Sequence, residues 1–293
     1  MPDSPRLLVA GSIALDTLEG PWGTAEEELG GSALYFALAA SLFTPVALVA
    51  PVGIEEEDRV RELLEGRRVD LAGLAVIDAA TYRWHSRRLG TRDLDLGSQD
   101  GIYDAWTPAT PPAFRGWAFV GSMRPGLQLQ AAARLRAADL LAGDAMRSYV
   151  RSAPVESAGF VAACDWFFCT VQELSALGGD PAHPEAFRLR HGLRGLVVKA
   201  GPAGLCAYTE RGPSRVPALT ARPVRDPTGA GDALAGGMLA CWQRLGGGPE
   251  ALWEALAQGV ACASVAISEV GLRGLAAATL DEVMVRARDL SPA

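Results

Sequence analysis

Strand-like and helix-like apolar patterns alternate along the N-terminal part of the sequence. RLLVAGSIALD indicates a buried strand ending near Gly11, GGSALYFALAASLF a glycine turn and an apolar helix, and VALVAPVG another buried strand. EEEDRVRELLEGRRVDLAGL has the spacing of an amphipathic helix that ends near Gly66. Buried strands separated by helices are typical of a parallel sheet covered on both faces. The sequence therefore predicts a three-layer α/β/α fold with a mainly parallel central sheet.

The alternation is interrupted between about residues 75 and 106. Short runs such as TYRWHSRRLGTRDLDL interleave aromatic and charged residues there, without a long helix pattern. We interpret this segment as a few antiparallel strands that project from the main sheet as a small β lid. Strand and helix patterns then resume, and no repeat or long linker divides the chain. We expect one domain over residues 1–293 with the lid inserted in it.

Composition limits the classes of partner. The formal net charge is -7, and neither nucleic acid nor an anionic membrane surface is expected, because both are bound by basic surfaces. The five cysteines are odd in number and contain no CxxC pair, so neither a disulfide framework nor a zinc site is predicted. With no basic and apolar leader at its start, the sequence favours a cytoplasmic location.

The segment DPTGAGDALAGG, residues 226–237, combines glycines with two aspartates. Glycine lets the backbone approach a ligand, and amide groups at a helix start attract negative charge. The turn that we expect to form such an anion hole consists of Thr228, Gly229, Ala230 and Gly231. A carboxylate beside it, Asp232, would repel a phosphate that is merely bound. As a general base, however, Asp232 could take the proton of an attacking hydroxyl while the amides stabilise the transferring phosphoryl group.

A structural interpretation of the same segment stays open. Asp226 and Asp232 would then be turn and N-cap residues, a frequent use of aspartate beside glycine. The chain has no Gly-Lys dipeptide, which excludes a Walker-type phosphate loop. No GxGxxG follows the first strand, which argues against an oxidoreductase with a dinucleotide fold.

Several segments together resemble the ribokinase-like (PfkB-type) carbohydrate kinases. DPTGAGDALAGG is similar to the C-terminal signature of that family, and GSIALD followed by GGSALYFALAAS resembles its first signature. FFCTVQE, VVKAGPAG and GVACASVAISEVG match further family segments in order, so the resemblance covers essentially the whole chain. It implies a ribokinase-like fold and phosphorylation of a hydroxyl on a sugar or polyol, with ATP and Mg²⁺.

The resemblance also implies roles for matching residues on the acceptor side. Asp232 would be the general base beside the anion hole of Gly229, Ala230 and Gly231. Asp16 would bind acceptor hydroxyls, and it follows the first strand where open α/β sheets bind ligands. The further candidates for acceptor binding are Gly30, Gly31, Ser32 and Arg83.

On the nucleotide side, the resemblance implies contacts to phosphate and ribose from Lys199, Gly201 and Gly204, with Thr228 beside them. Thr170 stands where the family usually has asparagine, and its hydroxyl can still donate to a phosphate or a water. Glu173 matches a glutamate that helps to hold magnesium, and Asp144 fits an acidic position near the metal.

Open alternatives concern the same positions. For Lys199, the structural alternative is a position on the surface. For Glu173, it is a role at the positive end of a helix dipole. Val260 stands where relatives often have asparagine near adenine, which leaves the donor base open. Together with Thr170 in place of asparagine, Val260 also leaves open that the protein binds its ligands without catalytic turnover.

The acceptor is not specified by the sequence. Relatives that phosphorylate ribose have lysine and asparagine where this chain has Ser32 and Tyr35, so the ribose pocket is not reproduced. Arg83 and its neighbours Arg87 and Arg88 would suit a phosphorylated sugar. Aromatic residues of the same segment, Tyr82 and Trp84 with His85, would instead cover an uncharged ring, which we favour, with a nucleoside as the alternative. We expect a homodimer through the lid, because an open strand edge favours pairing.

Overall fold

The computed structural model describes residues 7–90, 92–111, 113–220 and 223–291. Its main sheet has nine strands, of which the seven from β11 to β5 run parallel and the last two, β12 and β13, are antiparallel. In sheet order the strands are β13 (Gly212–Val216), β12 (Leu205–Thr209), β11 (Gly195–Lys199), β10 (Trp166–Thr170), β9 (Leu140–Asp144), β8 (Trp117–Val120), β1 (Leu7–Ala10), β4 (Val46–Gly53) and β5 (Val69–Ile77). The predicted α/β fold with a mainly parallel sheet is confirmed.

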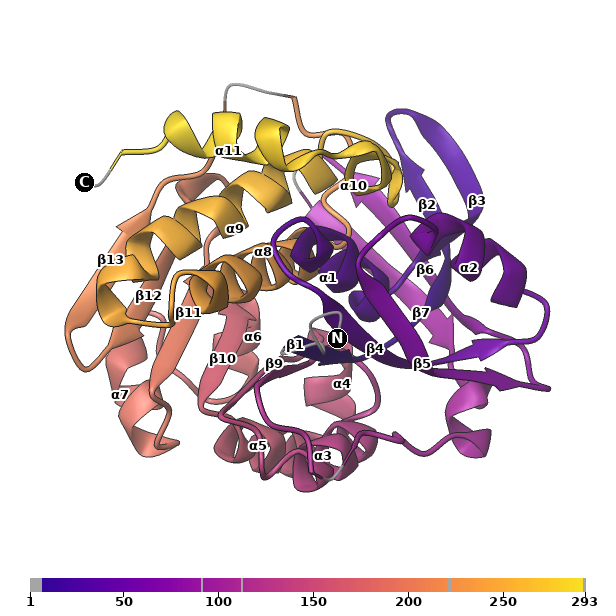
Figure 1. Ribbon diagram of the computed structural model, residues 1–293, viewed down its shortest axis with the longest axis horizontal. Coiled ribbons are helices and arrows are strands. Elements are labelled where there is room, and N and C mark those ends of the chain that lie inside the picture. The colour runs from indigo at the N-terminus through magenta and orange to yellow at the C-terminus, as the bar shows by residue number, and fades with distance from the viewer. Residues whose placement is uncertain (1–6, 91, 112, 221–222, 292–293) are drawn as a thin grey trace.

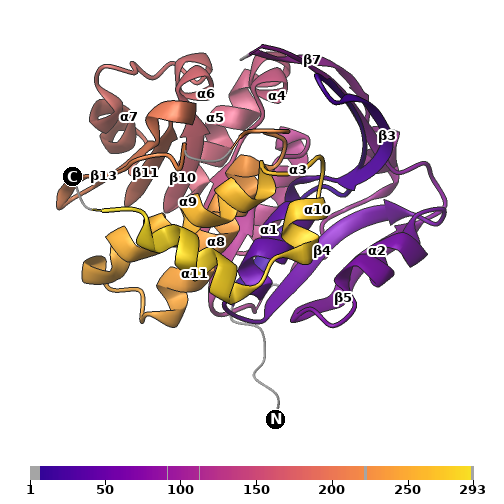
Figure 2. The same cartoon turned by 90° about the horizontal axis from the view of Figure 1, so that it is seen from above.

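Helices cover both faces of this sheet, as Figures 1 and 2 show. Alternate residues of β1 enter different cores: Leu7 and Val9 pack on one side, Leu8 and Ala10 on the other. The first side carries α1 (Ser32–Ser41), α2 (Glu57–Leu64), α8 (Ala230–Arg244), α9 (Leu252–Ala266), α10 (Arg273–Ala277) and α11 (Leu280–Arg288). The second carries α3 (Pro125–Arg134), α4 (Arg147–Ser152), α5 (Pro154–Ala163), α6 (Val171–Ala176) and α7 (Pro184–Arg190). Short 3₁₀ turns are η1 (Gly101–Ala105), η2 (Gly201–Ala203) and η3 (Pro249–Ala251).

The lid is a separate four-stranded sheet, beside the β4 and β5 end of the main sheet in Figure 1. Its strands are β3 (Gly23–Gly30), β2 (Ala14–Gly20), β6 (Tyr82–Leu89) and β7 (Arg92–Gln99), in that order. The sequence predicted a lid only at about residues 75–106, but residues 14–30 supply half of it. Their sequences, ALDTLEG and GTAEEELG, lack the apolar density of a core strand. Asp16 therefore lies inside a lid strand rather than in a loop after β1.

No helix in the described part of the chain is both long enough and apolar enough to span a bilayer.

Close packing of α1 on α8 depends on a glycine. A Cβ atom at Gly236 would lie 2.4 Å from the carbonyl oxygen of Phe36. The Phe36 ring stacks on Phe119 with centroids 4.6 Å apart, so α1 has little room to retreat. This contact fixes the first half of α8 against the middle of α1.

Substitution of Gly236 tests this packing. We expect Gly236→Ala to lower the free energy of unfolding by about 1–3 kcal/mol, because the added methyl group overpacks the helix contact. The control is Gly126→Ala in α3, where an added Cβ meets nothing within 4 Å. Denaturant unfolding of both variants measures the difference, and equal stability of the two would contradict the close contact.

Candidate active site

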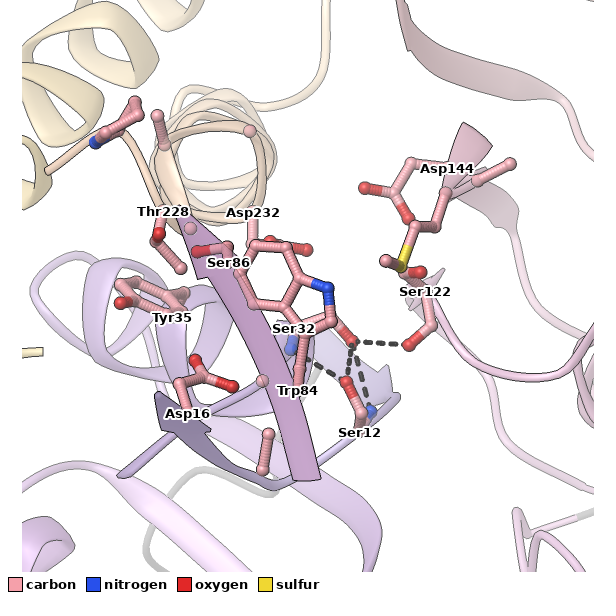
Figure 3. Close-up of a pocket in the computed structure, with 18 of the residues that line it drawn as sticks. Ser12, Asp16, Ser32, Tyr35, Trp84, Ser86, Ser122, Asp144, Thr228 and Asp232 are labelled. Atoms are coloured by element: carbon pink, nitrogen blue, oxygen red, sulfur yellow. Dashed lines mark hydrogen bonds between the residues drawn. The ribbon is translucent and has the colours of Figure 1, made fainter. Parts of the chain in front are cut away.

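A cavity of about 290 Å³ lies between the lid and the carboxyl ends of the central strands (Figure 3). Asp144, Thr170 and Lys199 end β9, β10 and β11 and line it from the main sheet. Asp16 and Trp84 line it from the lid. The predicted site residues that line the cavity are Asp16, Gly31, Ser32, Asp144, Thr170, Glu173, Lys199, Thr228, Gly229, Ala230, Gly231 and Asp232.

The turn before α8 lines this cavity with Thr228, Gly229, Ala230 and Gly231, and within it the Ala230 amide donates to the Pro227 carbonyl at 3.2 Å. Gly229 has φ +71°, a left-handed conformation that favours glycine, and a Cβ there would lie 2.2 Å from the Tyr35 ring. Ala230 begins α8, and Gly231 and Asp232 follow in its first turn. The predicted anion hole thus stands at the positive end of a long helix.

The two aspartates of the segment differ in their contacts. Asp226 is buried and accepts hydrogen bonds through Oδ1 from the amide (3.1 Å) and hydroxyl (2.7 Å) of Thr228. Its Oδ2 accepts from the Gly271 amide at 3.0 Å. Asp232 Oδ1 is also buried, yet it has no hydrogen-bond partner among the described residues. The structural interpretation therefore holds for Asp226, whereas Asp232 keeps an oxygen that a ligand can use.

Four charged groups meet on the main-sheet side. Burial raises the pKa of Asp232 to about 6, although Lys199 opposes this. Burial, with the charge of Asp232, also raises the pKa of Asp144 well above its usual range. Burial opposes the charge of Lys199, but Glu173, Asp144 and Asp232 outweigh it and raise its pKa. A Cβ at Gly231 would lie 2.6 Å from Lys199 Nζ, so the ammonium group lies against the anion hole.

Thr170 and Glu173 form a reciprocal capping box at the start of α6. Thr170 Oγ1 accepts a hydrogen bond from the Glu173 amide at 3.1 Å, and the Thr170 amide donates to Glu173 Oε2 at 2.7 Å. The hydroxyl proton of Thr170 stays available, because its oxygen acts only as the acceptor in this pair. Both side chains also line the cavity, so a structural role and a ligand-binding role are compatible.

The carboxylates of Asp144 and Glu173 suit a magnesium ion that substrate phosphates also bind. Across the described ranges, no three His, Cys, Asp or Glu side chains gather as a complete metal site. Mg²⁺ usually keeps several waters and takes only one or two carboxylates together with substrate phosphates. Asp144, whose Oδ1 is buried without a hydrogen-bond partner in the described structure, and Glu173 suit that mode.

Asp16 is the carboxylate on the lid side, and its side chain is 2% exposed. A Cβ at Gly30 would lie 2.1 Å from Asp16 Oδ2, so this glycine leaves room for the carboxylate although it does not line the cavity itself. Gly31 has φ +94° and joins the lid to α1. Burial, followed by the charges of nearby carboxylates, raises the pKa of Asp16 well above its usual range.

Strand β6 turns Tyr82 and Trp84 to one face, and Arg83 and Arg87 to the other. Tyr82, Trp84 and Ser86 line the cavity, as the two-residue period of a strand requires. The Trp84 indole extends over the cavity in Figure 3, and its Nε1 donates to Asp95 Oδ1 at 3.1 Å.

Residues between these face away, which corrects the expectation for Arg83. Arg83 pairs with Glu27 at 2.8 Å, and His85 and Arg87 each lie 2.6 Å from Glu19. None of the three lines the cavity.

Ser32 lines the cavity, but its hydroxyl is already committed. Its oxygen accepts from the Ser12 amide (3.0 Å) and contacts the Ser12 hydroxyl (3.1 Å), and its proton goes to the Ser122 carbonyl (3.1 Å). A hydroxyl has one donor and two acceptor positions, so these contacts use all of them. These contacts therefore indicate that Ser32 links the segments after β1 and β8 and does not bind the acceptor directly.

Two glycines assigned to the nucleotide lie outside the cavity. Gly201 begins η2, and an added Cβ there meets nothing within 4 Å. Gly204 follows η2, where a Cβ would lie 2.2 Å from the Val216 carbonyl oxygen. Close packing against β13 thus explains Gly204 without a ligand. Val260 is buried in the core beside α8.

Several residues that line the cavity were not predicted from the sequence. Ser12 and Ser122 come just after β1 and β8, and Met146 just after β9. They could have been found as small or flexible residues directly beyond parallel strands, because ligands bind at the carboxyl ends of such strands.

Substitution of Ser32 tests whether its hydroxyl stabilises the fold or binds the acceptor. We expect Ser32→Ala to lower the free energy of unfolding by about 1–3 kcal/mol, because groups of Ser12 lose a buried partner. The control is Ser175→Ala, whose exposed hydroxyl donates only to the Val171 carbonyl. Thermal or denaturant unfolding measures both. Unchanged stability with a raised acceptor KM would show instead that Ser32 binds the acceptor.

A comparison with protein-family models identifies one family. Residues 22–278 match the model of the pfkB family carbohydrate kinases. No curated protein sequence matches the chain significantly.

Solved structures of similar fold include a Burkholderia thailandensis nucleoside kinase in complex with inosine, with a TM-score of 0.79 and 17% identity over 97% of both chains. The aminoimidazole riboside kinase of Salmonella enterica, complexed with aminoimidazole riboside and an ATP analog, has a TM-score of 0.76 and 21% identity over 96% of this chain and 99% of that one. Ribokinase from Cryptococcus neoformans in complex with ADP has a TM-score of 0.74 and 20% identity over 97% and 100%. These likenesses show a shared ribokinase-like fold, and the family match covers most of the chain. The protein therefore belongs to the pfkB family of carbohydrate kinases, phosphotransferases with an alcohol group as acceptor.

Proposed function

We propose that the protein transfers the γ-phosphate of ATP to a hydroxyl of an uncharged sugar or polyol. One observation carries this proposal: Asp232 has a buried, unpaired oxygen at the mouth of the anion hole, in the same cavity as Asp16. A base, a phosphate-binding turn and an acceptor-binding carboxylate are the groups that this transfer needs close together.

Each group has a separate task in the proposed reaction. Asp16 accepts hydrogen bonds from acceptor hydroxyls, while Asp232 takes the proton of the hydroxyl that attacks the γ-phosphorus. The bond from γ-phosphorus to the bridging oxygen breaks, and ADP leaves with that oxygen. Amide groups of Gly229, Ala230 and Gly231 stabilise charge on the transferring group, and Lys199 adds a positive charge beside them.

The donor side is proposed at the ends of β9, β10 and β11. Thr170 and Lys199 would contact phosphates, and Glu173 with Asp144 would hold Mg²⁺ directly or through water. The ion would neutralise phosphate charge during transfer. Relatives of this fold were solved with ADP or an ATP analog, which supports ATP as the donor here.

Charge in the cavity favours an acceptor without a phosphate of its own. Lys199 is the cation among the described lining residues, and it lies on the donor side against Gly231. The lid contributes Asp16 but turns Arg83 and Arg87 outward into pairs with glutamates. A phosphate already present on the acceptor would therefore face the Asp16 carboxylate, and no cation among the described lining residues of the lid would offset its charge.

A nucleoside acceptor is the second candidate. The half-buried Trp84 indole lies over the cavity, with Tyr82 on the same strand face. An aromatic surface of this kind can stack on a planar base as well as on the apolar face of a sugar. A homodimer through the lid edges and a cytoplasmic location stay predictions.

A panel of acceptors with Mg-ATP tests the reaction. We expect ADP release with at least one of D-ribose, D-fructose, myo-inositol and inosine, and a much lower rate with fructose 6-phosphate, because the lid side carries negative charge. A coupled ADP assay measures each rate. A clear preference for the phosphorylated sugar would overturn the proposed acceptor class.

Substitution of the proposed base gives the sharpest mutational test. We expect Asp232→Asn to lower kcat by about 10²–10⁴-fold with little change in acceptor KM, because the attacking hydroxyl keeps its proton. The matched control is Asp281→Asn, an exposed aspartate in the first turn of α11, which should keep wild-type rates. Undiminished kcat in the Asp232 variant would remove the base from the mechanism.

The pH dependence follows from the raised pKa of Asp232. Its pKa of about 6 means that the carboxylate is mostly ionised above that pH and protonated below it. Because a protonated base cannot accept the hydroxyl proton, kcat/KM should fall as the pH drops through about 6. Initial rates between about pH 5 and 8 test this. A flat profile across that range would contradict the assignment.

A further inference from the structure

The segment of residues 270–273 contacts both sides of the active site. The Gly271 amide donates to Asp226 Oδ2 at 3.0 Å, and the other oxygen of Asp226 holds Thr228 of the anion-hole turn. Two residues later, Arg273 at the start of α10 forms an ion pair with Glu28 of the lid strand β3. One short segment thus connects the anion hole to the lid.

Glu28 lies directly opposite Asp16 in the lid sheet. The register of β2 and β3 pairs these two residues, and directly opposed residues in a sheet share one face. Asp16 belongs to the lid, whereas Asp232 belongs to α8 on the main body. The position of β3 relative to α8 therefore sets how the two carboxylates face one acceptor.

We propose that Arg273 is a positioning residue for phosphoryl transfer, because its ion pair with Glu28 holds the strand pair that carries Asp16 against the anion-hole turn. This inference rests on the proposed function, since it takes Asp16 as the group that binds the acceptor. Arg273 itself does not line the cavity.

Charge gives Arg273 a second effect on the same carboxylate. Around Asp16 stand Glu28 from β3, Tyr35 from α1, Asp226 before α8 and Asp232 within it, while β6 supplies the Tyr82 phenol and the uncharged Trp84. Burial is the main cause that raises the pKa of Asp16, and Asp226, Asp232 and Glu28 raise it further. Arg273 balances Glu28, so its loss leaves one more uncompensated negative charge opposite Asp16.

Opposite substitutions in this ion pair should have opposite effects on pH dependence. Without Arg273, the unbalanced Glu28 should raise the pKa of Asp16, and the acid limb of acceptor binding, measured as 1/KM, should move to higher pH. Without the charge of Glu28, that pKa should fall, and the limb should move to lower pH. A purely structural ion pair would give shifts of the same sign, or none, when either partner is lost.

The experiment compares Arg273→Gln, Glu28→Gln and Arg273→Lys, with Mg-ATP and the best acceptor of the panel above. For Arg273→Gln we expect acceptor KM to rise about two- to fivefold, the range for loss of an exposed ion pair, with kcat nearly unchanged. Arg273→Lys should recover most of the wild-type KM. The acid limbs of the two glutamine variants should move in opposite directions.

Glu27 provides a matched control on the neighbouring residue. It also pairs with an arginine, Arg83, at 2.8 Å, and it does not line the cavity. Glu27→Gln should therefore leave acceptor KM and the acid limb unchanged. Equal effects of Glu27→Gln and Glu28→Gln, or limb shifts of the same sign in the two Glu28–Arg273 variants, would overturn the proposal.

Two further measurements keep this test independent of the reaction chemistry. Hydrogen exchange without any acceptor should be faster at β3 amides near Glu28 in Arg273→Gln than in wild type, and equal exchange would count against the positioning role. Asp232→Asn is assayed in parallel. Activity that survives in it would contradict the proposed base, whereas the response to Arg273 substitution would still stand on its own.

Discussion

One buried carboxylate fixes the geometry on which the active site depends. Asp226 bonds the amide and hydroxyl of Thr228 with one oxygen and the amide of Gly271 with the other. These bonds hold the turn before α8 so that Gly229 packs on Tyr35 and the first residues of the helix line the cavity. Since a buried carboxylate without such donors is costly, the loop and its anchor stabilise each other. Asp226 thus has the structural role, whereas one oxygen of Asp232 stays without a hydrogen-bond partner among the described residues.

The site is assembled from two parts that meet only across the cavity. The main body supplies Asp232, Lys199, Asp144 and Glu173, and the lid supplies Asp16 and the Trp84 indole. This division explains why the two key aspartates are far apart in sequence yet face one cavity. Contacts between lid and body such as the Glu28–Arg273 pair matter for the proposed reaction, because the alignment of the proposed base with the acceptor would depend on them.

Patterns that depend on local chemistry could be predicted from the sequence, and those that depend on register could not. The central strands β1 and β4 are apolar on both faces, so they were recognisable. The β2–β3 hairpin was missed because it carries charges and gains its burial only from β6 and the body. Arg83 was assigned to the acceptor because a sequence shows that β6 alternates but not which set faces inward. Ser32 was assigned without knowledge of Ser12 and Ser122, which reach it through the fold.

The central claim is that Asp232 faces the acceptor hydroxyl while the amides of residues 229–231 face the γ-phosphate. A crystal structure of the Asp232→Asn protein with Mg-ATP and the best acceptor of the panel tests it most directly, because the slow variant should hold both substrates. We predict an acceptor hydroxyl about 3 Å from the side chain at position 232, with the γ-phosphate on the anion-hole amides and other acceptor hydroxyls on Asp16. An acceptor bound away from position 232, or a γ-phosphate held elsewhere than at that turn, would contradict the account.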